Sequence, residues 1–162
     1  MTEIWEHIES RRVEFSHTDL AGIVHFSNYF RYMEMTEHGL FRSMGLSIVD
    51  RENPVGWPRV SAHCDFRHPL KFEDIFEDRL LILKKSRRSL EYLHVLRLPE
   101  ADRIVAIGRM SVVCVAIDET DRSFEARVIP DSISNRLVAA PPHIVAPFMN
   151  GGGSRAPKAG EA

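Results

Sequence analysis

One long amphipathic helix sets the strongest limit on how this chain folds. Over residues 26–44 the apolar side chains recur in steps of three, four and seven, which predicts a helix with one broad apolar face. Ser27 or Asn28 is expected to cap its start, and Gly45 to end it. Gly39, inside the helix, indicates a close packing contact. With no helical partner evident nearby, this face must be buried against another kind of element.

Segments of strand character supply that element. Alternating apolar and polar residues predict a first strand over 10–17, before the helix. After a loop at 53–58, further strands are expected at 59–66, 78–85, 90–98 and 104–117, with a short one near 125–129. Short polar turns at 99–103 and 118–123 imply an antiparallel sheet. The predicted class is therefore α+β, with the sheet wrapping the helix.

The chain length of 162 residues fits one domain. A short helix is expected at 132–138. Beyond it the sequence is rich in Pro, Gly and Ala and has no periodicity, as in flexible segments. We expect residues 1–138 to form the domain and residues 139–162 to form a flexible C-terminal tail.

Composition excludes several function classes. A formal net charge of -2 and a pI near 6.4 argue against a nucleic-acid partner. No apolar run is long enough for a signal peptide or a membrane span, so we expect a cytoplasmic protein without a membrane partner. Cys64 and Cys114 lie far apart in apolar runs, which favours buried thiols over a disulfide or a metal pair.

Asp19 is the residue best placed for chemistry. Gly22 follows three residues later, and Phe26 stands where the long helix should begin. Backbone N–H groups in a first helical turn lack partners and carry partial positive charge, so the Phe26 amide could stabilise an oxyanion. A carboxylate beside such a site suits attack on a carbonyl. An Asp beside a glycine is also a common loop cap, and that interpretation stays open.

The stretch at 18–37, TDLAGIVHFSNYFRYMEMTE, resembles the motif region of the 4-hydroxybenzoyl-CoA thioesterase family, acyl-CoA hydrolases of the hot-dog fold. In that family an Asp is followed by a Gly three residues later, two hydrophobic residues, and a Tyr ten residues after the Asp. The corresponding residues here are Asp19, Gly22, Ile23, Val24 and Tyr29. The likeness continues through FRHPLKFEDIFE and MSVVCVAID and covers roughly residues 13–138.

The resemblance implies a role for each motif residue. Asp19 would be the catalytic carboxylate, either as a general base on water or as a nucleophile through an anhydride, and the Phe26 amide would be the oxyanion donor. Gly22 and Tyr29 would lie around the substrate. Some members carry a histidine at the position of Phe26, whereas here His25 lies one place earlier. His25 is either a packing or helix-start residue or a substrate contact.

A basic stretch at 84–89 is the second candidate for binding. Lys85, Arg87, Arg88 and Ser89 stand at the junction of two predicted strands. They form either a solvated turn that blunts a sheet edge or a cationic patch for the phosphates of coenzyme A. Related thioesterases use a basic stretch at this place, which favours the second interpretation.

Three further polar residues are weaker candidates for a functional role. His63 could stand on a pocket wall, but Cys64 faces the other side of the same strand, so we expect no metal site. Glu34 and Glu37 on the long helix are expected to form salt bridges or hydrogen bonds to the sheet rather than to act in catalysis.

The prediction is thus a hot-dog acyl-CoA thioesterase that releases a carboxylic acid and free coenzyme A. No cofactor is implied, because coenzyme A is part of the substrate. The resemblance also implies a homodimer, often paired into a homotetramer, with active sites at the subunit interface. Two alternatives remain: a hot-dog dehydratase or hydratase, and a non-catalytic acyl-CoA-binding or assembly protein. The sequence does not assign the acyl group.

Overall fold

The computed structural model describes residues 3–48, 54–117, 120 and 123–149. Within them, one antiparallel sheet has the strand order β1-β4-β5-β6-β3, and a small second sheet has the order β2-β7-β8. The strands are β1 (Glu6–Arg12), β2 (Val55–Gly56), β3 (Arg59–Phe66), β4 (Ile75–Lys85), β5 (Ser89–Leu98), β6 (Arg103–Val113), β7 (Val115–Ile117) and β8 (Phe124–Ala126). The helices are the 3-10 turn η1 (Phe15–His17), α1 (Phe26–Ser43), α2 (Asp131–Ser134) and α3 (Pro142–Met149).

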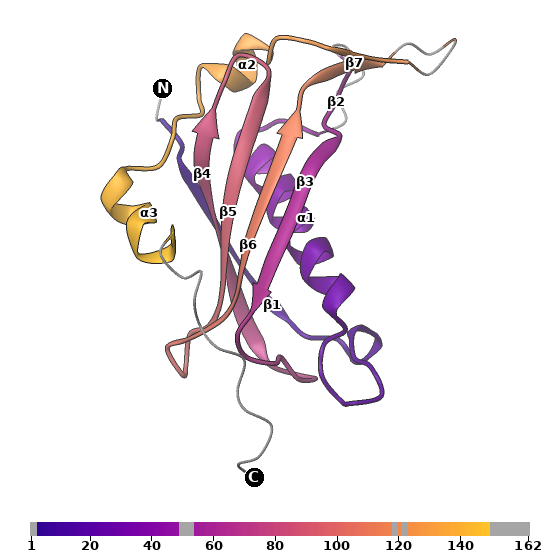
Figure 1. The fold of residues 1–162 in the computed structure, drawn as a ribbon, viewed down its shortest axis with the longest axis vertical. Coiled ribbons are helices and arrows are strands. Elements are labelled where there is room, and N and C mark those ends of the chain that lie inside the picture. Colours follow the sequence, from indigo (N-terminus) through magenta and orange to yellow (C-terminus); the bar gives the residue numbers. More distant parts are fainter. Residues whose placement is uncertain (1–2, 49–53, 118–119, 121–122, 150–162) are drawn as a thin grey trace.

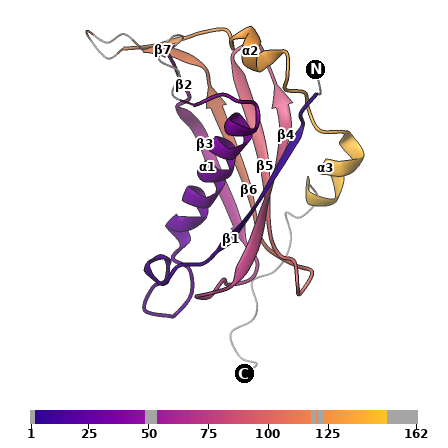
Figure 2. The same cartoon turned by 180° about the vertical axis from the view of Figure 1, so that it is seen from behind.

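Helix α1 lies across one face of the large sheet, as the sequence predicted (Figures 1 and 2). Its buried side packs against side chains from alternate positions along β4, β5 and β6, and together they make the main core. The largest fully buried side chains of this core include Met33, Leu40, Phe41, Phe76 and Tyr92. The predicted α+β layout, with the sheet wrapped around one long helix, is confirmed.

The helix ends show one correction. The N-cap is His25, whose Nδ1 accepts a hydrogen bond from the backbone N of Ser27 at 3.4 Å, so the prediction of Ser27 or Asn28 as the cap was wrong. Gly45 follows the helix with φ +69°, as predicted for a residue that ends it. The close contact predicted at Gly39 is also confirmed, because a Cβ there would collide with the Glu9 carboxylate of β1.

Strand bounds differ where pairing partners end. The first strand is β1 rather than residues 10–17, because its partner β4 begins at Ile75, opposite Arg12, and the chain then leaves the sheet. The predicted strand 104–117 is split into β6 and β7 at Cys114, whose backbone N–H donates a hydrogen bond to Arg88 O at 2.7 Å. The helix predicted over 132–138 spans only α2. Parts of the loop at 53–58 and of the turn at 118–123 lie outside the described residues.

Helix α3 corrects the prediction of a flexible tail from residue 139. It covers the sheet face opposite α1 (Figure 1). Its Val145 belongs to a second buried apolar cluster with Leu81, Leu93 and Ile107 of the sheet. Its sequence, PHIVAPFM, is apolar nearly all round and contains Pro147, so it has no amphipathic pattern to detect. The rest of the predicted tail, residues 150–162, lies outside the described residues.

Candidate active site

The chain between η1 and α1 folds back on itself as a tight loop. Asp19 N donates to Ile23 O at 2.9 Å, and Gly22 N donates to Asp19 O at 2.9 Å. Gly22 has φ +74°, a conformation that side chains of L-residues disfavour, so the glycine of the motif allows this turn. Val24 N donates to Leu70 O at 2.8 Å, which fixes the loop beside the start of β4.

The Asp19 carboxylate has one fixed oxygen and one available oxygen. Its Oδ1 accepts from Ala21 N at 2.8 Å, so the loop-cap interpretation is confirmed. No group among the described residues bonds to its Oδ2, and the side chain is exposed. The residue lines an open cavity of about 610 Å³ together with Phe15, Ser16, Thr18, Leu20, His25 and Asn28. The loop-cap bond orients the carboxylate and leaves its other oxygen open to this cavity.

Phe26 is the first residue of α1, and its backbone N–H has no acceptor among the described residues. It directly follows His25, which lines the same cavity as Asp19. The partial positive charge of a helix N-terminus favours an oxyanion at such a donor. The Phe26 side chain is 61% exposed, so the amide and not the ring is the group of interest.

His25 both starts the helix and lines the cavity. Its Nδ1 lies 2.8 Å from the Ser27 hydroxyl, and its ring lies 4.5 Å from that of Phe26. The helix-start interpretation is therefore confirmed. Tyr29, by contrast, is only 3% exposed and packs edge-on against Phe66. Burial raises the pKa of Tyr29 to about 12, and the side chain belongs to the core rather than to the cavity wall.

The basic stretch lies at the other end of the sheet. The Asp19 loop adjoins the start of β4, and Lys85 ends that strand of 11 residues, so they are separated by about 33 Å. Figure 1 shows the two ends, with α2 beside the basic one. Lys85 Nζ donates to Ser134 O at 2.7 Å, and Ser89 closes the turn with Ser86, whereas the Arg87 and Arg88 side chains are exposed. One chain does not bring these residues to Asp19.

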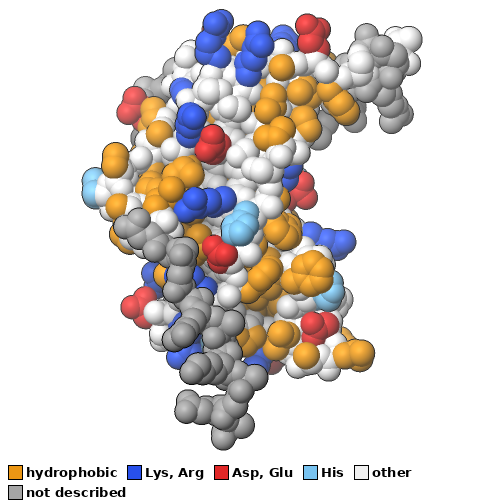
Figure 3. Space-filling view, in the orientation of Figure 1, with side chains coloured by type: hydrophobic (Ala, Val, Ile, Leu, Met, Phe, Trp, Pro, Cys, Tyr) orange, Lys and Arg blue, Asp and Glu red, His pale blue; other side chains and the backbone are white. Residues whose placement is uncertain are grey.

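His63 also lies apart from Asp19. Its Nε2 lies 3.1 Å from Asp65 Oδ1, on the sheet face opposite α1. Figure 3 shows histidine and charged side chains in the middle of this face. The two residues line a separate cavity of about 340 Å³ with Arg109. Cys64 points to the core, and both cysteines are free thiols. Among the described residues, no group of three or more His, Cys, Asp or Glu side chains could hold a metal ion.

Glu34 and Glu37 both pair with Arg59 of β3, as predicted for salt bridges. The Glu37 contact is 2.7 Å and fully buried on the Glu side, and the Glu34 contact is 3.5 Å and more exposed. Burial raises the pKa of Glu37, and the neighbouring Arg59 guanidinium opposes that rise. The pair ties α1 to the sheet and lines neither cavity described above.

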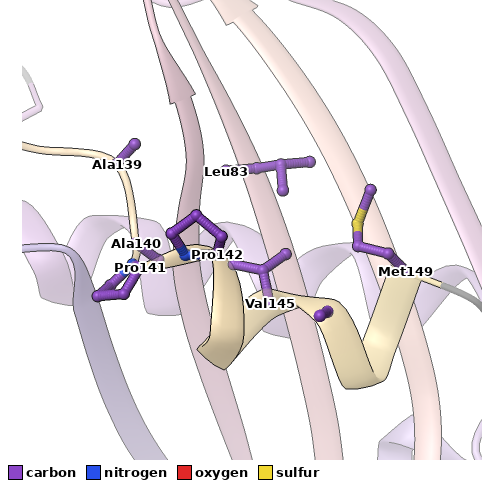
Figure 4. A pocket seen from close by; sticks show the side chains of 8 residues that line it. Leu83, Ala139, Ala140, Pro141, Pro142, Val145 and Met149 are labelled. Atoms are coloured by element: carbon purple, nitrogen blue, oxygen red, sulfur yellow. The ribbon is translucent and has the colours of Figure 1, made fainter.

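A further cavity of about 600 Å³ lies between α3 and β4 (Figure 4). Its lining is wholly apolar, from Leu83 of β4 to Val145 and Met149 of α3. It offers no side chain that can transfer a proton or attack a carbonyl. The cavity at Asp19 is the candidate active site, because it combines a carboxylate with the start of a long helix.

Sequence reasoning missed how the loop is held. Asn28 lines the cavity and donates through Nδ2 to His17 O at 2.8 Å, although it was expected only as a possible cap. Tyr32 lies one turn further along α1, and its hydroxyl is 2.8 Å from His17 Nδ1. The four-residue spacing of these two polar side chains on an otherwise apolar helix face is the signal that could have found them.

Comparisons with known proteins identify the family of the chain. Residues 13–148 match the thioesterase-like superfamily. A protein of Aquifex aeolicus (strain VF5) named "Putative esterase" is 36% identical over 89 residues, which are 54% of this chain and 70% of that protein. The 4-hydroxybenzoyl-CoA thioesterase of Pseudomonas sp. (strain CBS-3) is 32% identical over 89 residues, which are 52% of this chain and 62% of that enzyme.

Solved structures show the same fold. A gentisyl-coenzyme A thioesterase superposes with a TM-score of 0.68 at 28% identity, over 78% of this chain and 98% of that one. In the described part of the chain, no helix is long and apolar enough to cross a membrane. The fold, the motif and the match over residues 13–148 together place the chain in the thioesterase-like superfamily, as a thioester hydrolase of the hot-dog fold.

Proposed function

We propose that the chain hydrolyses an acyl-CoA thioester to a carboxylic acid and free coenzyme A, with Asp19 and the Phe26 amide as the catalytic groups. The observation that carries this proposal is that an Asp19 carboxylate oxygen and the Phe26 N–H at the start of α1 both lack a hydrogen-bond partner among the described residues, beside one cavity. Attack on a carbonyl needs a group that delivers the nucleophile and a donor that stabilises the oxyanion.

The chemical step has two routes at this site. Asp19 Oδ2 takes a proton from a water that attacks the thioester carbonyl, or it attacks the carbonyl itself and forms an anhydride that water then opens. In both routes the carbonyl oxygen becomes negative beside the Phe26 N–H, and its collapse breaks the C–S bond. The coenzyme A thiolate that leaves takes up a proton, from the Asp19 carboxyl in the first route and from water in the second. Gly22 shapes the loop, and His25 lines the path of the acyl group.

A homodimer resolves the separation between Asp19 and the basic turn. β3 is an edge strand with exposed Val60 and Phe66, and Phe66 contacts Tyr29 at the Asp19 end. Arg59, at the other end of β3, lies at the basic end, since it pairs with Val112 next to the partner of Ser89.

Antiparallel pairing of β3 with β3 of a second copy would cover the β3 edge of each chain. It would also place the basic turn of one chain beside the Asp19 loop of the other. Arg87 and Arg88 would then grip the phosphates of coenzyme A at the partner's site, assisted by Lys85 and Ser89. The dimer, its pairing into a tetramer and a cytoplasmic location are predictions.

The test is thiol release from a panel of acyl-CoA substrates. The panel contains 4-hydroxybenzoyl-CoA and gentisyl-CoA, which the relatives' names suggest, together with short, medium and long aliphatic acyl-CoA. Asp19→Asn should lower kcat by about 10²–10⁴, the range for loss of a positioned base. The matched control is Asp102→Asn, which removes an exposed carboxylate in the turn between β5 and β6 and should leave kcat unchanged.

Each outcome has a distinct meaning. Full activity of Asp19→Asn would overturn the assignment of the carboxylate. Binding of acyl-CoA without thiol release would favour the non-catalytic alternative. Conversion of the acyl chain with the thioester intact would favour the dehydratase or hydratase.

A further inference from the structure

His17 fastens the Asp19 loop to α1 through both its backbone and its side chain. Its carbonyl oxygen accepts from Asn28 Nδ2 at 2.8 Å and from His25 N at 2.9 Å. Its Nδ1 lies 2.8 Å from the Tyr32 hydroxyl, and the two rings meet edge to face with centroids 5.4 Å apart. Asn28 and Tyr32 are one helical turn apart, so side chains on one face of α1 contact both the carbonyl and the imidazole of His17.

The backbone of Glu14 indicates the role of the imidazole nitrogen. Glu14 N lies 3.3 Å from His17 Nδ1, and a backbone N–H can only donate, so Nδ1 acts as an acceptor in this contact. Burial raises the pKa of Tyr32 to about 12, so its hydroxyl keeps the proton that it donates to the same Nδ1.

The helix side of this contact is fixed. Tyr32 is 2% exposed, and its ring packs 4.7 Å from that of Phe76 in the core. His17 is half-buried and stands only two residues before Asp19. Thr18, between them, pairs with Val24 on the returning arm of the loop. A displacement of His17 would therefore be passed directly to the Asp19 carboxylate.

We propose that His17 is a positioning residue that holds the Asp19 carboxylate at its working position through the Tyr32 hydrogen bond. This inference rests on the proposed role of Asp19. A misplacement of catalytic groups by about 1 Å can cost on the order of a hundredfold in rate. Because the two backbone contacts of His17 remain when the side-chain bond is lost, the expected cost is smaller, about tenfold.

The test is a double-mutant cycle on kcat, with His17→Phe, Tyr32→Phe and the double variant. Each single change removes one partner and keeps an aromatic ring, and each should lower kcat about tenfold with KM within about twofold. The double variant should lose no more than either single variant. His17→Asn is the rescue, because its Oδ1 can accept where Nδ1 accepts, and it should keep kcat within about threefold of wild type.

The matched control for the loss of a tyrosine hydroxyl is Tyr92→Phe. The Tyr92 hydroxyl is buried and has no hydrogen-bond partner among the described residues, so its removal should leave kcat unchanged. A second readout is hydrogen exchange at the protected loop amides of Asp19, Gly22 and Val24. Exchange should accelerate in His17→Phe and Tyr32→Phe, and remain slow in His17→Asn and Tyr92→Phe.

Two results would overturn the proposal. One is a double variant whose loss of kcat is the product of the losses in the two single variants. The other is a His17→Asn variant with a kcat as low as that of His17→Phe. Failure of the proposed function looks different, because Asp19→Asn would then keep full activity whatever His17 does. Exchange at the loop amides reports on the His17 fastening without any substrate.

Discussion

The two ends of β4 carry the two sets of residues that the sequence singled out, and they are built differently. At the start of the strand, backbone hydrogen bonds close the Asp19 loop over a cavity and leave one carboxylate oxygen open. At the far end, the Ser86 hydroxyl closes a turn from which Arg87 and Arg88 extend into solvent. Under the proposed function, the first end would hold a reacting carbonyl in a fixed geometry, whereas the second would bind a charged group that tolerates variable geometry.

The largest effect that sharpens this contrast is expected from Phe26→Pro. Proline is tolerated at the first position of a helix and removes the backbone N–H. His25 has φ -62° and ψ 135°, which is the conformation that a following proline favours. We expect kcat to fall by about 10²–10³, the usual cost of one lost oxyanion donor, with a smaller change in KM.

Phe26→Ala is the control, because it removes the exposed ring and keeps the amide. Steady-state thiol release and thermal unfolding of both variants provide the measurement. Equal kcat in the Pro and Ala variants would show that the N–H takes no part in the reaction.

A smaller effect, on binding, is expected at the basic end. Arg87→Ala combined with Arg88→Ala should raise KM for acyl-CoA about tenfold, equivalent to about 1.4 kcal/mol, with kcat within about twofold. The side chains are exposed, and no ion pair within the described residues holds them. An N-acyl cysteamine substrate, which lacks the phosphates, should not distinguish the variant from wild type. An unchanged KM for acyl-CoA would show that the basic turn does not bind the substrate and is only a solvated turn at the end of the sheet.

The smallest effects are expected from two glycines with positive φ. Gly22 (φ +74°) and Gly45 (φ +69°) both have open space where a Cβ would lie, so alanine at either adds backbone strain without a clash. Each substitution should lower the free energy of unfolding by about 1–2 kcal/mol. Gly22→Ala should also lower kcat several-fold, about three- to tenfold, because Gly22 shapes the Asp19 loop.

Gly45→Ala should leave kcat unchanged, since Gly45 follows the far end of α1. Chemical denaturation and thiol release on the same samples separate the two effects. A similar loss of kcat in both variants would mean that the loop responds to global stability rather than to its own geometry.

Local patterns predicted the elements that carry them. Helix α1 lies where its periodicity placed it, because it has one wet and one buried face over enough residues to be detected. Strand β3 also has the predicted bounds, 59–66. Helix α3 was missed since its residues are apolar on nearly all sides and two of them are prolines. Its place on the sheet follows from the apolar outer face of β4, β5 and β6, which no local pattern of the tail reveals.

The sequence predicted which motif residues lie together at the candidate site, but not where the other candidate residues lie; the chemistry of the site stays a prediction. Asp19, His25 and the start of α1 come together as the motif implied, because they are neighbours in sequence. Tyr29 entered the core, and His63 and the basic turn lie elsewhere, because their positions depend on strand order and on which face each residue points to. The contacts of Asn28 and Tyr32 with His17 could not be predicted, because they depend on the geometry of the folded loop.

The central claim is that Asp19 of one chain and the basic turn of another serve the same substrate. The most direct test is a hybrid dimer, purified through two different tags, of an Asp19→Asn chain and an Arg87→Ala, Arg88→Ala chain. Such a hybrid contains one intact site only if the two ends meet across the dimer. We predict about half the wild-type kcat with a wild-type KM for acyl-CoA. A hybrid with the raised KM of the arginine variant would contradict this arrangement.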